Sequence, residues 1–403
     1  MMRYWRLISI VAVIVVVVST FYIQSAVATH QYPAFALEKQ RGDEKEAEGV
    51  TLHGEYAKEA QYHSLNITTA GSKDDFEGTY FERLARENAP SHIKKLRKDY
   101  KAFMRGKDID MDESMLYDDK SLLAYVELEP FDELDNKYTF DIDILEKESK
   151  NRESFKVTQH NDKYSYLDVA GVFVSHGEVI VFTRNYARKS ENMEIHAYWF
   201  NIADGKLMHE EPILSIDEED EQTNANINLI NSNDGKDNNH FVLFQKDHYV
   251  NYNDEQMDSE PWETELLAYD LERKELEKIK LPEEIDGITN TGVINQSKLY
   301  FANETEHTFE IFSYDVENEK MKNIYKMKIS NAVDPIEDQG ITWNIDNNKL
   351  YMSSVLSDNI SLADLKIVDL DSGDTLYEGT VEAKSQQSLA ELDDFIVSGI
   401  SIE

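Results

Sequence analysis

The sequence predicts an all-β protein built from several small antiparallel sheets, preceded by an apolar N-terminal segment and a short helical stretch. Two observations predict this fold. A short phrase that marks a β-hairpin returns four times in the second half of the chain, and helical periodicity disappears after Asp108. A chain of 403 residues with 41% hydrophobic residues can also bury a large core.

The phrase consists of an aromatic residue or Val, then Asp or Asn, an aliphatic residue, a polar turn, and Leu or Met. Each copy joins the end of one alternating strand to the start of the next, through turn residues that a hairpin requires. Repetition at roughly 45 to 70 residues is typical of small sheets in a radial array. The copies occupy residues 200–207, 269–276, 314–321 and 368–376, and a fainter copy lies at 142–144.

Residues 1–28 have the features of an export segment. Arg3 and Arg6 precede an uncharged run over 7–23, and small residues follow it at Ala26 and Ala28. The 17 residues of this run fall between the core of a signal peptide and a membrane-spanning helix, which needs ~20 residues. A cleaved signal peptide and an uncleaved membrane anchor therefore remain alternatives, and both place the acidic bulk outside the cytoplasm. The Cys-free, Asn-, Lys- and Glu-rich composition suits a Gram-positive bacterium.

The next segments connect the export segment to the β-rich region. Residues 29–49 are predicted to be a linker, because 38–49 are polar and charged without an apolar period. Residues 50–107 are predicted to hold two strands, at 50–56 and 63–69, and then the helical segment.

The stretch over 91–105 is the only convincing helix of the mature chain. An apolar stripe at helical spacing lies between Ser91, a candidate cap, and Gly106, a residue that ends helices. We expect the stripe to pack on the β domain while the basic residues point outward. The stripe consists of Ile93, Leu96, Tyr100, Phe103 and Met104.

Residues 108–403 are predicted to form the β domain, with one sheet for each group of strands. The predicted groups are 114–158, 165–216, 225–281, 290–330 and 340–384. Their predicted middle strands are 122–128, 178–183, 241–245, 299–302 and 350–353.

One strand, at residues 395–400, has no group of its own. A terminal strand of this kind commonly completes a sheet begun at the other terminus, because the pairing removes two open edges. We expect it to pair with a strand from the first 70 residues, near 50–69. This gives six sheets, with five and seven as the neighbouring alternatives.

The phrases Tyr269-Asp270-Leu271 and Tyr314-Asp315-Val316, each followed by a charged turn and another strand, resemble the repeats of bacterial β-propeller proteins of the WD-like and YVTN-like kind. The resemblance covers about residues 110–403. It implies a ring with a central channel and faces built from loops. Together with the six sheets counted above, the expected fold is β-propeller-like with about six blades. No Gly-His and Trp-Asp pair marks each repeat, so the resemblance identifies no subfamily and carries over no functional residue.

Composition excludes several classes of function. The chain has 79 acidic and 41 basic residues and a formal charge of −38, so most of its surface would repel nucleic acid and anionic lipid. We expect no nucleic-acid partner. The absence of cysteine removes disulfides, thiolate nucleophiles and Cys-ligated metals. No cofactor is expected, apart from a candidate Ca²⁺.

Two acidic loops are the Ca²⁺ candidates. In the first, carboxylates stand at alternate positions as at the start of a calcium loop, but Glu113 replaces the required Gly and Asp119 replaces the usual Glu. The second has oxygen donors around Gly235 at a compressed spacing. Solvated acidic loops are the alternative for both, so we expect any dependence on Ca²⁺ to be modest. The candidate ligands are Asp108, Asp110 and Asp112 in the first loop and Asn231, Asn233, Asp234 and Asp237 in the second.

Two groups of side chains are candidates for binding. Seven of the 41 basic residues fall within 94–107, and a basic helix can bind an acidic partner, lie on an anionic membrane, or balance the acidic surface of its own chain. Tryptophans can line a carbohydrate or peptide groove or pack inside sheets. The binding candidates are Lys94, Lys95, Arg97, Lys98, Lys101, Arg105, Trp199, Trp262 and Trp343.

No pattern in the sequence identifies catalytic residues. The histidines form neither a nucleophile elbow nor a His-Glu-x-x-His helix, and no phosphate-binding glycine loop is present. The sequence favours a non-catalytic binding or sensory module at the outer face of a bacterial membrane. It would be attached through residues 1–28 if these stay uncleaved, with a protein or cell-envelope partner. The alternative is a propeller-fold glycan hydrolase or lyase that uses paired carboxylates.

Overall fold

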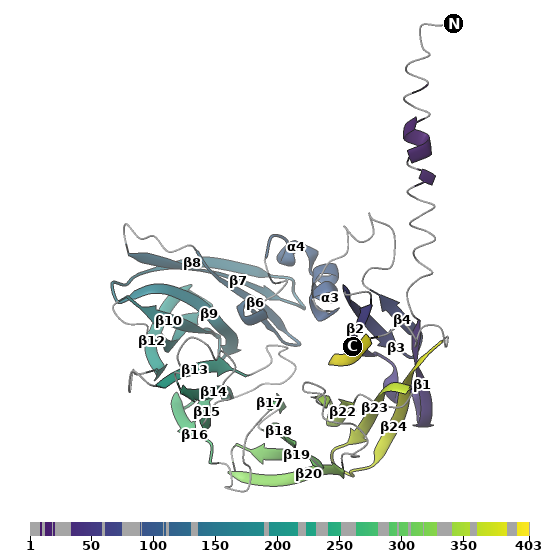
Figure 1. Cartoon of the computed structure of the whole chain (residues 1–403). Helices are drawn as coiled ribbons and strands as arrows, with labels where there is room; N and C mark the ends of the chain where they lie inside the picture. Colours follow the sequence, from purple (N-terminus) through teal and green to yellow (C-terminus); the bar gives the residue numbers. More distant parts are fainter. Residues whose placement is uncertain are drawn as a thin grey trace, which may run out of the picture. The chain divides into compact units, whose positions relative to one another are not determined.

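The computed structural model (Figure 1) describes residues 9, 13–17, 19–20, 34–58, 61–74, 89, 91–107, 109, 113–129, 136–188, 193–216, 223–230, 241–250, 263–280, 290–295, 298–304, 308–316, 318–328, 341–354, 361–384 and 393–402. The chain divides into two compact units, residues 1–94 with 330–403, and residues 95–329. The described residues form six antiparallel sheets and few helices, which confirms the all-β prediction.

The unit of residues 95–329 contains four sheets, each made of four strands in chain order. The first contains β5 (Leu116–Asp118), β6 (Leu122–Leu128), β7 (Lys137–Glu146) and β8 (Arg152–His160), with the 3-10 turn η4 (Glu113–Met115) before β5. The second contains β9 (Tyr164–Ser175), β10 (Glu178–Ala187), β11 (Met193–Asn201) and β12 (Lys206–Ser215). The third contains β13 (Thr223–Leu229), β14 (Phe241–Val250), β15 (Glu263–Asp270) and β16 (Glu275–Lys278). The fourth contains β17 (Asn290–Asn295), β18 (Lys298–Glu304), β19 (Thr308–Asp315) and β20 (Lys320–Lys328).

These sheets coincide with the predicted strand groups, and each predicted middle strand is the second strand of its sheet. Every sheet packs on the next through a separate apolar core. In β11, Tyr198 and Phe200 belong to the core shared with the first sheet, whereas Trp199 belongs to the core shared with the third. Leu243 and Phe301 lie in the core between the third and fourth sheets. Strands buried on both faces explain the nearly continuous apolar runs, and this stacking of small sheets is β-propeller-like.

The recurring phrase has a structural cause. Its Asp or Asn is the last residue of the third strand, and its side chain accepts hydrogen bonds from the backbone of the turn that follows. Asp270 Oδ1 accepts from the backbone N–H groups of Glu272 at 2.8 Å and Arg273 at 2.9 Å. The carboxylate thus satisfies turn donors that have no strand partner. Equivalent bonds reach Asn201 from Asp204, Asp315 from Asn318, and Asp369 from Asp371 and Ser372.

The fainter copy at 142–144 is not a hairpin phrase. Asp143 lies inside β7, which continues to Glu146, and the turn into β8 passes through Lys150 at φ 57°. Asp143 is buried and holds an ion pair instead of a turn.

The unit of residues 1–94 and 330–403 contains two sheets. A five-stranded sheet has the order β1-β24-β23-β22-β21, and a four-stranded sheet has the order β25-β2-β3-β4. The first comprises β21 (Thr342–Asp346), β22 (Lys349–Ser353), β23 (Ser361–Asp369), β24 (Thr375–Ala383) and β1 (Phe35–Gly42). The second comprises β25 (Asp393–Ile402), β2 (Val50–Lys58), β3 (Gln61–Thr68) and β4 (Gly71–Asp74).

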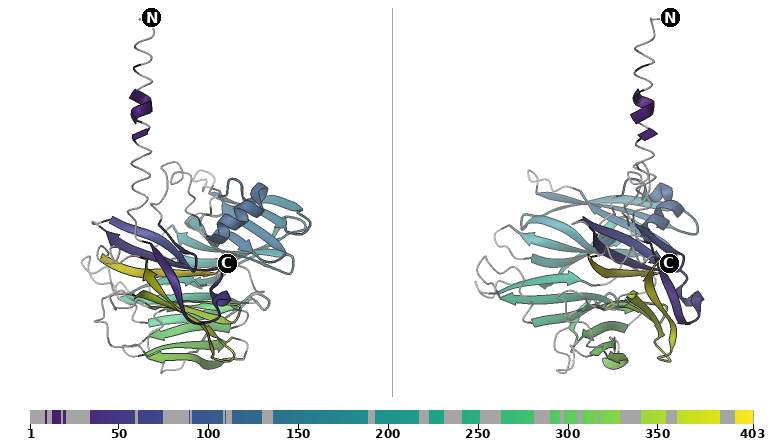
Figure 2. Two further views of the ribbon diagram at one scale, coloured as in Figure 1. Left: turned by 90° about the vertical axis from the view of Figure 1, so that its right-hand side faces the viewer. Right: turned by 45° about the vertical axis from the view of Figure 1, so that its right-hand side comes forward.

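The C-terminal strand pairs with the N-terminal region, as predicted. β25 is antiparallel to β2, and Figure 2 shows the yellow C-terminal strand beside the purple N-terminal strands. Phe395 stands opposite Tyr56, and Ile400 stands opposite Leu52. Phe395, Tyr56 and Leu52 all enter one core with Leu365 of β23, which joins the two sheets. Thr342 Oγ1 of β21 also donates to the carbonyl of Val397 at 2.7 Å.

The prediction of a solvated linker over 38–49 is wrong. Residues Phe35–Gly42 form β1, which pairs with β24, and Glu44–Ala47 form the 3-10 turn η3. Only Phe35, Ala36 and Leu37 of β1 are buried, so its exposed half has the polar composition of a linker. Gly42 is required where β1 ends, since it has φ +91° and a Cβ there would lie 2.1 Å from the carbonyl oxygen of Leu376.

The predicted export segment lies mostly outside the described residues. Residues 9, 13–17 and 19–20 are helical. Among the described residues, no helix has both the length and the apolar character needed to cross a membrane.

Candidate binding site

The predicted helical stretch forms two short helices, α3 (Ser91–Asp99) and α4 (Lys101–Met104). The prediction of one helix over 91–105 is therefore corrected. Tyr100 separates the two at φ −122° and ψ 43°, and its ring lies 5.6 Å from Lys147 Nζ.

The apolar stripe is buried. Ile93, Leu96, Phe103 and Met104 are buried, and Tyr100 is half-buried. Most of the basic residues are exposed, while Arg97 is half-buried. The exposed ones are Lys94, Lys95, Lys98, Lys101 and Arg105.

Lys107 is the exception, because it points inward. Its Nζ donates to Asp143 Oδ2, and each of the two side chains is 7% exposed. The same ammonium lies 4.1 Å from the ring centroid of Phe103 and 4.9 Å from that of Tyr125. An aromatic enclosure and a carboxylate together compensate the burial of this charge.

Asp143 also receives Arg152, whose Nε and Nη2 donate to the two carboxylate oxygens at 2.7 Å each. Hydrogen bonding to Asp143 raises the pKa of Arg152 above its ordinary value. Because Asp143 lies in β7 and Lys107 directly follows the α4 turn, this cluster fixes the end of the helical segment to the first sheet.

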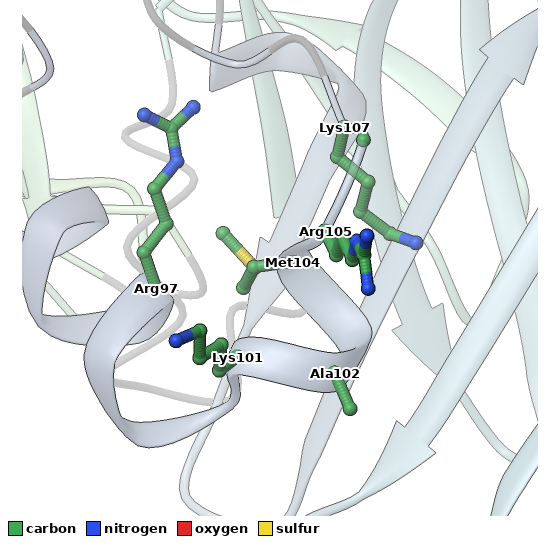
Figure 3. Close-up of a pocket in the computed structure, with 7 residues that line it drawn as sticks. Arg97, Lys101, Ala102, Met104, Arg105 and Lys107 are labelled. Atoms are coloured by element: carbon green, nitrogen blue, oxygen red, sulfur yellow. The ribbon is translucent and has the colours of Figure 1, made fainter.

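A surface pocket of about 670 Å³ lies where α3 and α4 meet the following turn. Figure 3 shows Met104 between Arg97 on one side and Arg105 with Lys107 on the other. Gly106, at φ +82°, turns the chain so that Lys107 returns toward the sheet. The described lining residues are Arg97, Lys101, Ala102, Met104, Arg105, Gly106 and Lys107.

The pocket combines an apolar floor with positive walls. Met104 and Ala102 supply the apolar contact, and none of the described residues that line the pocket is a carboxylate. Within the described part of the chain, Lys101 and Arg105 form no ion pair, whereas Lys107 is already bound to Asp143. Positive potential at the pocket therefore comes chiefly from Lys101 and Arg105.

Neither of the two described tryptophan candidates lines this pocket. Trp199 is 1% exposed and lies in the core between the second and third sheets, with Lys274 Nζ 4.4 Å from its ring centroid. Trp343 is half-buried in β21, in the other unit. Trp262 lies outside the described residues. Because Trp199 is buried in this core, its role is packing.

The candidate Ca²⁺ ligands also lie outside the described residues, in both loops. Asp119, the twelfth position of the first loop, is described and is occupied by its own turn. Its Oδ1 accepts from the backbone N–H groups of Ser121 at 2.7 Å and Leu122 at 2.6 Å. In the described ranges no three His, Asp or Glu side chains converge as a metal site would require.

Sequence reasoning missed a buried polar cluster in the second sheet. His196 Nε2 lies 2.7 Å from the Tyr164 hydroxyl and 3.0 Å from Glu194 Oε2, and His196 Nδ1 lies 3.3 Å from Glu210 Oε1. Burial opposes ionisation of Glu194, but hydrogen bonds from His196, Lys163 and Tyr164 outweigh it and lower its pKa to about 2. Burial is the main cause that raises the pKa of Tyr164 to about 12, and its hydrogen bond with Glu194 raises it further. The alternation Glu194-x-His196-x-Tyr198 on one strand face was the available signal.

A second missed group joins three strands of the other unit. His53 Nδ1 lies 2.7 Å from Asn66 Oδ1, and His53 Nε2 lies 3.0 Å from Ser401 Oγ. The three residues come from β2, β3 and β25. Because Ser401 is 348 positions from His53, no local motif could reveal this arrangement.

No protein-family model matches this chain, and no curated protein matches it. Among solved structures, TolB from Acinetobacter baumannii aligns at TM-score 0.33 and 11% identity, over 87% of this chain and 66% of TolB. A putative 6-phosphogluconolactonase from Bacteroides fragilis aligns at TM-score 0.30 and 12% identity, over 88% of this chain and 98% of that one. A prolyl endopeptidase aligns at TM-score 0.32 and 11% identity, over 93% of this chain and 55% of the enzyme. The chain thus spans just under two thirds of TolB and about half of the endopeptidase, and these likenesses assign no family or activity.

Proposed function

We propose that this protein is an extracytoplasmic binding module whose basic pocket at α3 and α4 takes an acidic peptide segment of a partner protein. The observation that carries the proposal is the set of cations around Met104 in a chain with a formal charge of −38. A glycan hydrolase would need two carboxylates facing its cleft, and the described lining of this pocket supplies cations and apolar groups instead. Its chemistry suits recognition.

An acidic peptide fits the pocket better than a membrane surface does. The formal charge of −38 would oppose docking of the whole protein on an anionic membrane. A short peptide would meet only the pocket and its rim. An aliphatic side chain can contact Met104 while a neighbouring Asp or Glu pairs with Arg105 or Lys101.

The test compares two double charge reversals in the full-length protein. Lys101→Glu with Arg105→Glu changes the pocket. Lys95→Glu with Lys98→Glu makes the same change of charge at exposed positions of α3 that do not line the pocket. Binding of a fluorescent peptide of alternating Glu and Leu is measured by anisotropy at several salt concentrations, beside vesicles that contain anionic lipid.

We expect the pocket variant to lose at least tenfold in peptide affinity and the α3 variant to lose little. Affinity of the unchanged protein should fall as salt rises, because the contacts are charge-assisted. Equal losses in both variants would show that general charge, not the pocket, attracts the peptide. Tight binding to vesicles with none to the peptide would replace the proposed partner by a membrane.

Location outside the cytoplasm rests on Arg3, Arg6 and the apolar run 7–23. Added protease should therefore degrade the β domain on intact spheroplasts. A mature protein that starts at Thr29 would indicate a cleaved signal peptide and secretion. An uncleaved chain in the membrane fraction would indicate a membrane anchor. Intact protein in the cytosol would contradict the proposed location.

A further inference from the structure

We propose that Ser401, His53 and Asn66 form a nucleophile, base and orienting group that accepts small acyl groups from esters. The proposal is independent of the basic pocket, since all three residues lie in the unit of residues 1–94 and 330–403.

The pairing of three strands brings these residues together. Asn66 of β3 stands directly opposite His53 of β2, and Ser401 of β25 stands opposite Thr51, two positions before His53. The residue opposite His53 on β25 is Gly399, where a Cβ would lie 3.4 Å from His53 Cδ2. With no side chain at Gly399, the imidazole can lie across β25 and reach the serine.

The hydrogen bonds assign a role to each ring nitrogen. Asn66 Oδ1 can only accept, so His53 Nδ1 carries the proton and donates to it at 2.7 Å. His53 Nε2 then presents its lone pair to the Ser401 hydroxyl at 3.0 Å. This is the polarity that activates a serine: a base within hydrogen-bond reach of the hydroxyl, held in one tautomer by a third group.

The partial exposure of the three side chains would let a small ester reach Ser401. His53, Asn66 and Ser401 are all half-buried, so the serine is neither enclosed in the core nor fully solvated. In acyl transfer, Ser401 Oγ bonds to the acyl carbon while the ester bond to the alcohol breaks. The hydroxyl proton passes to His53 Nε2 and then to the departing oxygen. Water next attacks the acyl-serine and returns a proton through Nε2 to Ser401, giving an acid and an alcohol.

The test uses the full-length protein with a fluorophosphonate probe, which labels activated serines, and with p-nitrophenyl acetate. Peptide mass spectrometry should place the adduct on Ser401. His53→Gln should slow labelling by about 100-fold or more, the range expected for loss of a general base. Asn66→Asp should preserve labelling, because its carboxylate still accepts from Nδ1, whereas Asn66→Ala should reduce it. The matched control is Ser398→Ala, an exposed β25 serine whose hydroxyl donates to the His53 carbonyl at 3.3 Å.

A purely structural role predicts a different result. If these hydrogen bonds only hold β25 on β2, the variants would lower the melting temperature without changing any labelling rate. Absence of an adduct on the unchanged protein, an adduct on another serine, or unchanged labelling of a folded His53→Gln variant would each overturn the proposal. Mapping of the adduct on the unchanged protein decides the question even if a variant fails to fold.

Discussion

At the scale of single residues, the Asp or Asn at the end of the third strand in four sheets links the sequence repeat to the fold. The phrase is recognisable because four turns need the same side-chain acceptor at the end of a third strand. We expect Asp270→Ala to lower the free energy of unfolding by about 1 kcal/mol, since it removes the acceptor for two backbone N–H groups. Asp270→Asn keeps an acceptor oxygen and should cost less. Urea unfolding measures both, and equal losses would mean that charge, not the hydrogen bonds, stabilises the turn.

The cluster of Lys107, Asp143 and Arg152 should respond asymmetrically to mutation. Asp143→Ala leaves the buried ammonium of Lys107 without its carboxylate and should cost about 3 to 5 kcal/mol. Lys107→Met should cost about 1 kcal/mol, because Arg152 still holds Asp143 and the thioether can pack against Phe103 and Tyr125. Chemical denaturation compares the two variants. Equal costs would contradict the view that Asp143 serves both cations.

These residues also show what sequence could and could not predict about the candidate site. The basic cluster and its apolar stripe were visible, because helical spacing is local. The burial of Lys107 was not, because its partner Asp143 is 36 positions away and was interpreted as part of a hairpin phrase. The His53 group was hidden for the same reason, since strand pairing alone brings Ser401 to it.

At the scale of elements, the terminal strands β1 and β25 complete the two sheets of the unit of residues 1–94 and 330–403. β25 was predictable because an apolar strand without a group needs a partner. β1 was not, because five of its eight residues are exposed and polar or glycine, and only pairing with β24 makes them a strand. The partner strand of β1 is distant in the sequence, so the local composition of β1 does not indicate that it forms a strand.

Removal of residues 393–403 should disrupt the unit that contains β25. Phe395, Val397 and Ile400 are buried, and each apolar side chain of this size contributes about 1.5 to 3 kcal/mol, so the loss approaches the whole stability of a typical domain. We expect the truncated protein to aggregate through the uncovered edge of β2. A synthetic peptide of residues 393–403 should restore a soluble species on gel filtration, while the same peptide with Ser at the three buried positions, Phe395, Val397 and Ile400, should not. A soluble, cooperatively unfolding truncated protein would show that β25 is dispensable.

At the scale of the whole molecule, charge dominates the expected response to pH. A formal charge of −38 destabilises the compact state through self-repulsion, which protonation of ordinary carboxylates relieves. Carboxylates with lowered pKa values act in the opposite direction. Glu194 has its pKa lowered to about 2, and a hydrogen bond with His196 is the main cause of the lowered pKa of Glu210.

The final prediction separates these two effects through Glu194. Because its folded pKa is depressed from 4.5 to about 2, its contribution is present above pH 4.5 and is lost as pH falls from 4.5 toward 2. The difference in unfolding free energy between the unchanged protein and Glu194→Gln should therefore be constant from pH 7 to about 5 and shrink steadily toward pH 2. Glu153→Gln, at an exposed position of β8, removes the same charge and is the matched control. It should show no such decline, because Glu153 has no hydrogen-bond or ion-pair partner among the described side chains. Urea unfolding at a series of pH values gives both curves, and a Glu194 difference that persists unchanged at low pH would show that its hydrogen bonds do not depend on ionisation.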